Sequence, residues 1–179
     1  MRRKAFLLGL LASAAGATTL VSASGVQPAQ ADFRISTSMA KLRSMASQLG
    51  APRLDGSVAV AGKEAPALYF GSTLINNRFD LVDAVSEEDG KGMTATFFSE
   101  NNGEYIRVST SVPKPDGTGR ATGTVLDPTG EVIAVIRQGK AFYGEVTILG
   151  VPYITGYEPL RDATGRVIGI YYVGYQKER

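Results

Sequence analysis

The chain has 179 residues, of which 44% are hydrophobic and 20% charged, and its formal net charge is +2. This length and composition predict one folded globular domain with a sizeable core. Because the sequence contains no Cys and no His, it excludes a thiol nucleophile, a disulfide, a thiolate or imidazole metal site and a Ser-His-Asp triad. We therefore expect a protein that is not an enzyme and that uses no metal or other cofactor.

Residues 1–31 have the pattern of a cleavable signal peptide. Basic residues 2–4 precede a short apolar run that extends to Leu20, and Ala29-Gln30-Ala31 supplies a small-residue cleavage site. Val21-Ser22-Ala23 is a second possible cleavage site. An uncleaved anchor helix is the alternative, which the shortness of the apolar run disfavours.

Removal of this segment changes the charge of the chain. The remaining 148 residues hold 16 basic and 17 acidic side chains, so the net charge becomes −1. A near-neutral domain with scattered basic residues offers no surface for nucleic acid. No second apolar run approaches the ~20 residues that a membrane span needs, so we expect a mature chain without a membrane span, located in the periplasm or secreted.

Three segments have helical character. Apolar residues recur at helical spacing over residues 35–49, and Gly50-Ala51-Pro52 ends this pattern. A short helix is expected around residues 79–85 and another around residues 132–136. Residues 53–63 are small and polar and are interpreted as a linker.

Five segments after Gly92 read as strands, because they are rich in Val, Ile, Thr, Tyr and Phe. They cover residues 94–98, 105–112, 141–149, 152–159 and 167–175. Asn101-Asn102-Gly103 joins the first two as a hairpin turn. The predicted fold class is α+β: a PAS-like five-stranded antiparallel sheet with an N-terminal amphipathic helix and short helices on one face.

Three patterns that resemble catalytic or metal motifs are better explained as ordinary structure. Ser38-Met39-Ala40-Lys41 fits S-x-x-K but has no companion motif, and Gly117-Thr118-Gly119 does not open a helix. Glu87-Glu88-Asp89 is typical of a solvated helix end.

One strand offers a candidate site. Alternation along residues 105–111 places Arg107 on the same face as Ser109 and Ser111. A guanidinium among hydroxyl groups is suited to bind a carboxylate, because its planar fork makes two parallel hydrogen bonds. The alternative is a structural salt bridge on an exposed sheet face.

The sequence resembles the Cache domains, which are extracytoplasmic sensor modules of bacterial chemoreceptors and sensor kinases. The resemblance is to the Cache 3/Cache 2 fusion type, and it runs from about residue 64 to 175. The motifs that carry it, in order, are YIRVSTS (105–111), GTVLD (123–127), GKAFYGE (139–145), PYITGYEPL (152–160) and DATGRVIGIYYVG (162–174). The domain organisation expected from it is a signal peptide (1–31), an N-terminal helix and linker (32–63) and a Cache-type ligand-binding domain (64–179).

The resemblance implies a pocket for a small ligand, often an organic acid, over the central strands. Arg107 lies where related carboxylate sensors place a ligand-binding arginine. Related citrate and C4-dicarboxylate sensors typically have a His at the position of Thr110, and the citrate-type sensors also have cations at the positions of Thr155 and Tyr157. Without those charges the expected ligand is a monocarboxylate. The candidate ligand-binding residues are Arg107, Ser109, Tyr143, Tyr153, Thr155 and Tyr157.

The expected function is extracytoplasmic sensing of a small organic acid, with signal transduction through a separate membrane receptor or sensor kinase, in chemotaxis or a related response. The chain ends at Arg179 without a transmitter domain, which is why a separate partner is expected. A structural or interaction protein with a pocket filled by its own side chains is the alternative. The size of the cavity beside Arg107 distinguishes the two.

Overall fold

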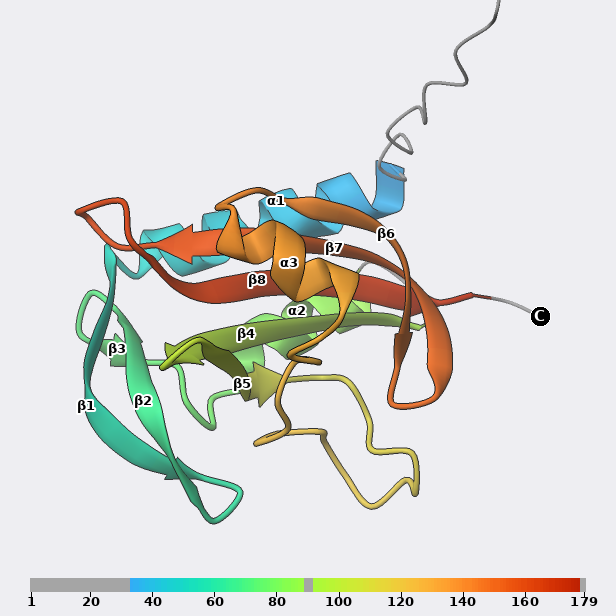
Figure 1. The fold of residues 1–179 in the computed structure, drawn as a ribbon, viewed down its shortest axis with the longest axis horizontal. Coiled ribbons are helices and arrows are strands. Elements are labelled where there is room, and N and C mark those ends of the chain that lie inside the picture. Colours follow the sequence, from blue (N-terminus) through green and yellow to red (C-terminus); the bar gives the residue numbers. More distant parts are fainter. Residues whose placement is uncertain (1–32, 89–91, 178–179) are drawn as a thin grey trace, which may run out of the picture.

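The computed structural model describes residues 33–88 and 92–177, and the described residues form three helices and two antiparallel sheets (Figure 1). The expected signal peptide lies outside this range. Among the described helices, none is long and apolar enough to cross a membrane. In chain order the elements are α1 (Phe33–Gln48), β1 (Pro52–Val60), β2 (Lys63–Phe70), β3 (Thr73–Leu74), α2 (Asp80–Glu88), β4 (Met93–Asn101), β5 (Glu104–Thr110), α3 (Glu131–Arg137), β6 (Phe142–Ile148), β7 (Val151–Arg161) and β8 (Val167–Gln176).

The larger sheet confirms the predicted five-stranded antiparallel architecture. Its strand order is β5-β4-β8-β7-β6. Strand β4, the first of the five in the chain, therefore pairs with β8, the last, which is the central strand of the sheet. The hairpin between β4 and β5 also forms as expected. Asn102 and Gly103 both have positive φ, 51° and 88°, which is the conformation that a two-residue hairpin turn requires.

Helix α1 forms because its apolar residues repeat at three- and four-residue intervals. Ile35, Met39, Leu42 and Ala46 are all buried. The helix is followed by Gly50, whose φ of 125° and close approach to Gly71 exclude a side chain. A Cβ atom at Gly50 would lie 2.7 Å from the Cα atom of Gly71.

The smaller sheet was not expected from the sequence. Most of the segment interpreted as a linker, residues 53–63, forms β1, which pairs with β2 and through it with β3. Most residues of β1 are exposed or only half-buried, so the strand lacks the apolar alternation that would reveal it. Figure 1 shows the β1–β2 hairpin beside the end of the five-stranded sheet.

The five-stranded sheet separates two apolar cores. On one face, which we call the α1 face, Phe97 and Val108 pack with residues of α1, α2 and β2. On the other, which we call the pocket face, Phe98 and Tyr157 pack with Ile133 of α3 and its neighbours.

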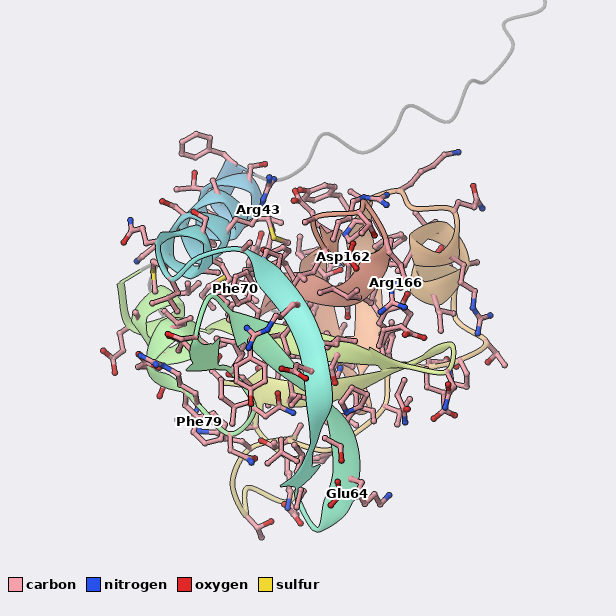
Figure 2. The ribbon with its side chains drawn as sticks, turned by 90° about the vertical axis from the view of Figure 1, so that its left-hand side faces the viewer. Arg43, Glu64, Phe70, Phe79, Asp162 and Arg166 are labelled. Carbon is pink, nitrogen blue, oxygen red and sulfur yellow. The ribbon has the colours of Figure 1, made fainter. Side chains whose placement is uncertain are left out.

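Helix α3 therefore lies on the face opposite α1 and α2. The expectation that all helices cover one face is wrong in this respect. Figure 2 shows α1 and α3 on opposite sides of the sheet strands. The reason is that α3 buries its own apolar residues against β6 and β7, whereas α1 packs on β7 and β8 from the other side.

Candidate functional site

The backbone at Arg107 is hydrogen-bonded on both sides of strand β5. On one edge β5 pairs with β4, and on the other its backbone is bonded to the segment that follows. The amide of Arg107 donates to the carbonyl of Thr124 at 2.9 Å, and the amide of Gly123 donates to the carbonyl of Arg107 at 2.8 Å. The arginine is thus rigidly positioned at the pocket face.

The side chain of Arg107 is buried without a carboxylate partner. The residue is only 4% exposed. Its Nη1 donates to Thr124 Oγ1 at 2.8 Å, and its guanidinium lies 4.9 Å from the centroid of the Phe98 ring. Within the described residues it makes no ion pair, and its Nε has no hydrogen-bond acceptor. Burial lowers the pKa of Arg107, but an arginine remains protonated in proteins.

Buried tyrosines surround this cation. Tyr157 and Tyr172 are completely buried, and their ring centroids are 4.9 Å apart. Burial raises the pKa of both phenols, so both hydroxyls stay protonated at neutral pH. The hydroxyl of Tyr172 is bonded to Thr94 Oγ1 at 3.1 Å, whereas the hydroxyl of Tyr157 has no hydrogen-bond partner among the described residues.

A cavity of about 190 Å³ lies beside Arg107 and Tyr157. Arg107 and Tyr157 are the most deeply buried polar residues of its lining, while Leu149 and Val125 are about 40% exposed and mark its outer side. The full lining is Arg107, Val125, Leu126, Asp127, Gly130, Glu131, Val132, Val146, Thr147, Ile148, Leu149 and Tyr157. Among the described residues, four buried side-chain polar atoms lack partners, and two of them, Arg107 Nε and the hydroxyl of Tyr157, belong to residues that line this one cavity.

The structure separates the residues that sequence alternation had placed with Arg107. Phe98 pairs with Arg107, but Phe97 pairs with Ser109, so Val108 is an extra residue in β5. This β-bulge breaks the two-residue period and turns Ser109 to the α1 face, where its hydroxyl donates to the carbonyl of Arg78. The expectation that Ser109 shares a face with Arg107 is wrong. Ser111 also faces α1, with its hydroxyl 2.7 Å from that of Ser86 in α2.

Tyr143 also lies on the α1 face. It packs over Gly156 beside Ile35 of α1, and its hydroxyl donates to Glu158 Oε1. It does not line the cavity.

Tyr153 and Thr155 share the pocket face with Tyr157, as expected, but neither lines the cavity. The hydroxyl of Tyr153 accepts a hydrogen bond from Gln176 Nε2 at 3.2 Å. The hydroxyl of Thr155 donates to the carbonyl of Gly144 at 2.8 Å. Of the six candidate residues, the structure brings only Arg107 and Tyr157 to one cavity.

Four polar residues at the site were not predicted. Thr124 holds the guanidinium of Arg107, and Asp127, Glu131 and Thr147 line the cavity. Thr124 and Asp127 belong to the GTVLD stretch that the sequence analysis had singled out without assigning it a role. Its proximity to Arg107 depends on the backbone pairing with β5, which a local pattern does not reveal.

The comparisons with known proteins agree with this architecture. The model of the Cache 3/Cache 2 fusion domain matches residues 23–179, a range that includes α1 and the smaller sheet. A comparison with curated proteins finds no relative that matches the chain. Cache domains are in general extracytoplasmic modules that sense small molecules, and they are sensor modules rather than enzymes. With a family match over most of its length and a PAS-like sheet that carries a small cavity, the chain belongs to the Cache 3/Cache 2 fusion domain family.

Proposed function

We propose that this domain senses a small monocarboxylate, which binds in the cavity beside Arg107 and Tyr157. The observation that carries the proposal is a cation that is 4% exposed, lacks a carboxylate partner within the described residues and lines a cavity. We further propose that occupancy of the cavity is read by a membrane receptor or sensor kinase, in keeping with the sensory role of the family.

The energetic argument begins with burial. An unpaired buried charge costs several kcal/mol, and proteins retain such a group only where something offsets that cost. The hydrogen bond to Thr124 and the ring of Phe98 offset part of it. A ligand carboxylate would supply the missing negative charge and an acceptor for Nε, and its second oxygen could accept from the hydroxyl of Tyr157.

The cavity also indicates the size of the ligand. The cavity is small, with a volume of about 190 Å³. Pockets for drug-sized ligands are larger, about 300–1,000 Å³. Arg107 is the only basic residue among the described residues of the lining, so they offer one site for a carboxylate rather than two or three. These features favour a ligand smaller than a drug molecule, with one carboxylate.

The presence of the cavity also counts against the alternative of a structural protein with a filled pocket. A filled pocket would use the side chains around Arg107 to satisfy its donors. Instead, Arg107 Nε and the hydroxyl of Tyr157 have no partners among the described residues.

Thermal unfolding in the presence of single compounds tests the proposal. The probes are acetate, propionate, lactate and pyruvate, with succinate and citrate as di- and tricarboxylate comparisons. A monocarboxylate at about 100 times its Kd should stabilise the protein by about 2.7 kcal/mol. Succinate and citrate should give smaller shifts, because Arg107 is the one basic side chain among the described residues that line the cavity.

Two variants and a matched control locate the site. Arg107→Met should abolish the stabilisation, and Arg107→Lys should weaken it, because an ammonium group cannot reproduce the planar fork. The control is Arg120→Met, which removes an arginine that is paired with Asp83 away from the cavity. Equal ligand-induced shifts in the wild type and in both Arg107 variants would refute binding at this face.

A further inference from the structure

The cavity beside Arg107 also has acidic side chains. Within residues 33–88 and 92–177, Asp127 and Glu131 are the only other charged residues of the lining, and both are exposed, whereas Arg107 is buried. The cavity therefore has a cationic inner end and an anionic outer end. A simple monocarboxylate would satisfy the inner end but would lie close to two negative charges.

Asp127 is fixed in place by a local turn. Its Oδ1 accepts hydrogen bonds from the amide of Thr129 at 2.9 Å and from Thr129 Oγ1 at 2.8 Å. These bonds lower the pKa of Asp127, so its carboxylate is ionised at neutral pH. The backbone N–H of Gly130 also lies near this carboxylate and contributes to the lowered pKa.

Glu131 stands at the first residue of α3 and has no ion pair or side-chain hydrogen bond to any described residue. Among the described residues, the Glu131 carboxylate thus lacks a partner at the outer end of the cavity, and the Asp127 carboxylate lacks a cationic one. At the inner end, Arg107 Nε and the hydroxyl of Tyr157 also lack partners within the described residues.

We infer that the ligand is a zwitterion, a small amino acid whose carboxylate binds Arg107 and Tyr157 and whose ammonium group faces Asp127 and Glu131. This inference rests on the proposed function, because it assumes that the cavity beside Arg107 is the ligand site. A ligand of this kind places each of its charges next to a group of opposite sign. A small amino acid also suits a cavity of about 190 Å³, which is below the range for drug-sized ligands.

The first experiment compares ligands that differ only in the cationic group. β-Alanine and 3-hydroxypropionate have the same number of non-hydrogen atoms and differ by an ammonium group against a hydroxyl. Alanine and lactate form a second such pair, with the substituent next to the carboxylate. Isothermal titration calorimetry of the full chain measures the Kd of each compound. In at least one of the two pairs, the amino acid should bind about fivefold to tenfold more tightly than the hydroxy acid of the same pair.

The second experiment removes the negative charges. In the double variant Asp127→Asn, Glu131→Gln, the asparagine keeps the Oδ1 acceptor of the turn while the charge is lost. The variant should reduce the affinity for the amino acid about fivefold or more, and it should leave the affinity for the hydroxy acid equal or improved.

Asp116→Asn is the matched control, because Asp116 makes the same two bonds to Thr118 in a turn outside the cavity. It should leave both affinities unchanged.

The outcomes separate this inference from the proposed function. If the hydroxy acids bind as tightly as the amino acids, and the double variant binds all four probes like the wild type, the zwitterion is refuted while the carboxylate site stands. If none of the four probes binds, both the inference and the proposed function are refuted. Selective loss of amino acid binding in the double variant, but not in Asp116→Asn, supports the inference.

Discussion

Replacing Arg107 with methionine should leave the ligand-free protein as stable as the wild type or more stable. The substitution keeps a long side chain in the core but removes the buried charge. It eliminates an unpaired-charge penalty of several kcal/mol. It also removes the bond to Thr124, worth about 1.5–3 kcal/mol, and the contact with the Phe98 ring, worth about 1–2 kcal/mol.

The difference between these contributions predicts that the free energy of unfolding of the variant exceeds that of the wild type by between zero and about 2 kcal/mol. Thr124 does not lose its last partner, since its hydroxyl also donates to the carbonyl of Ala121 at 2.8 Å. For a domain of this size, a gain of about 2 kcal/mol raises Tm by about 4–8 °C. A structural ion pair would give the opposite sign, because breaking a buried pair costs about 3–5 kcal/mol.

Urea unfolding of ligand-free protein, followed by circular dichroism, measures this difference directly. Arg120→Met provides the contrast, because Arg120 donates to both oxygens of Asp83 at 2.6 and 2.9 Å. This pair is about one-third exposed, so its loss should cost only about 1 kcal/mol. A loss of more than about 3 kcal/mol in Arg107→Met would refute the conclusion that Arg107 lacks a structural partner.

Four further changes test the packing and the assignment of faces. Phe97→Ala should cost about 3–5 kcal/mol in urea unfolding, because the ring is fully buried on the α1 face. Gly169→Ala should lower Tm, since its Cβ atom would lie 2.2 Å from the carbonyl oxygen of Phe98; an unchanged Tm would contradict this register. Burial raises the pKa of the Tyr157 phenol, so as the pH rises this phenol loses its proton in the unfolded chain before it does so in the folded protein. The free energy of unfolding should therefore fall above about pH 10, with Tyr157 contributing up to about 1.4 kcal/mol per pH unit. Urea unfolding from pH 9 to 11 should show a shallower fall in Tyr157→Phe, and an identical fall would contradict the assigned burial. Tyr143→Phe should leave the ligand-induced thermal shift unchanged, because Tyr143 lies on the α1 face; loss of the shift would show that this face takes part in binding.

The family and most of the secondary structure could be predicted from the sequence, because these depend on local patterns. The apolar stripe of α1, the strand composition after Gly92 and the Asn102-Gly103 turn are each encoded within a few neighbouring residues. Strand β1 could not be found in this way, because its many exposed residues leave no apolar alternation and only its pairing with β2 makes it a strand.

The composition of the candidate site depended on contacts between distant parts of the chain. Alternation placed Arg107 on the correct face but failed one residue later, because the bulge at Val108 depends on the register between β4 and β5. Tyr157 lines the same cavity as Arg107, whereas Thr124 and Asp127 reach the site only through the backbone bonds between β5 and the segment that follows it. A strand's period predicts which way a side chain points, but register and long-range pairing decide what it meets there.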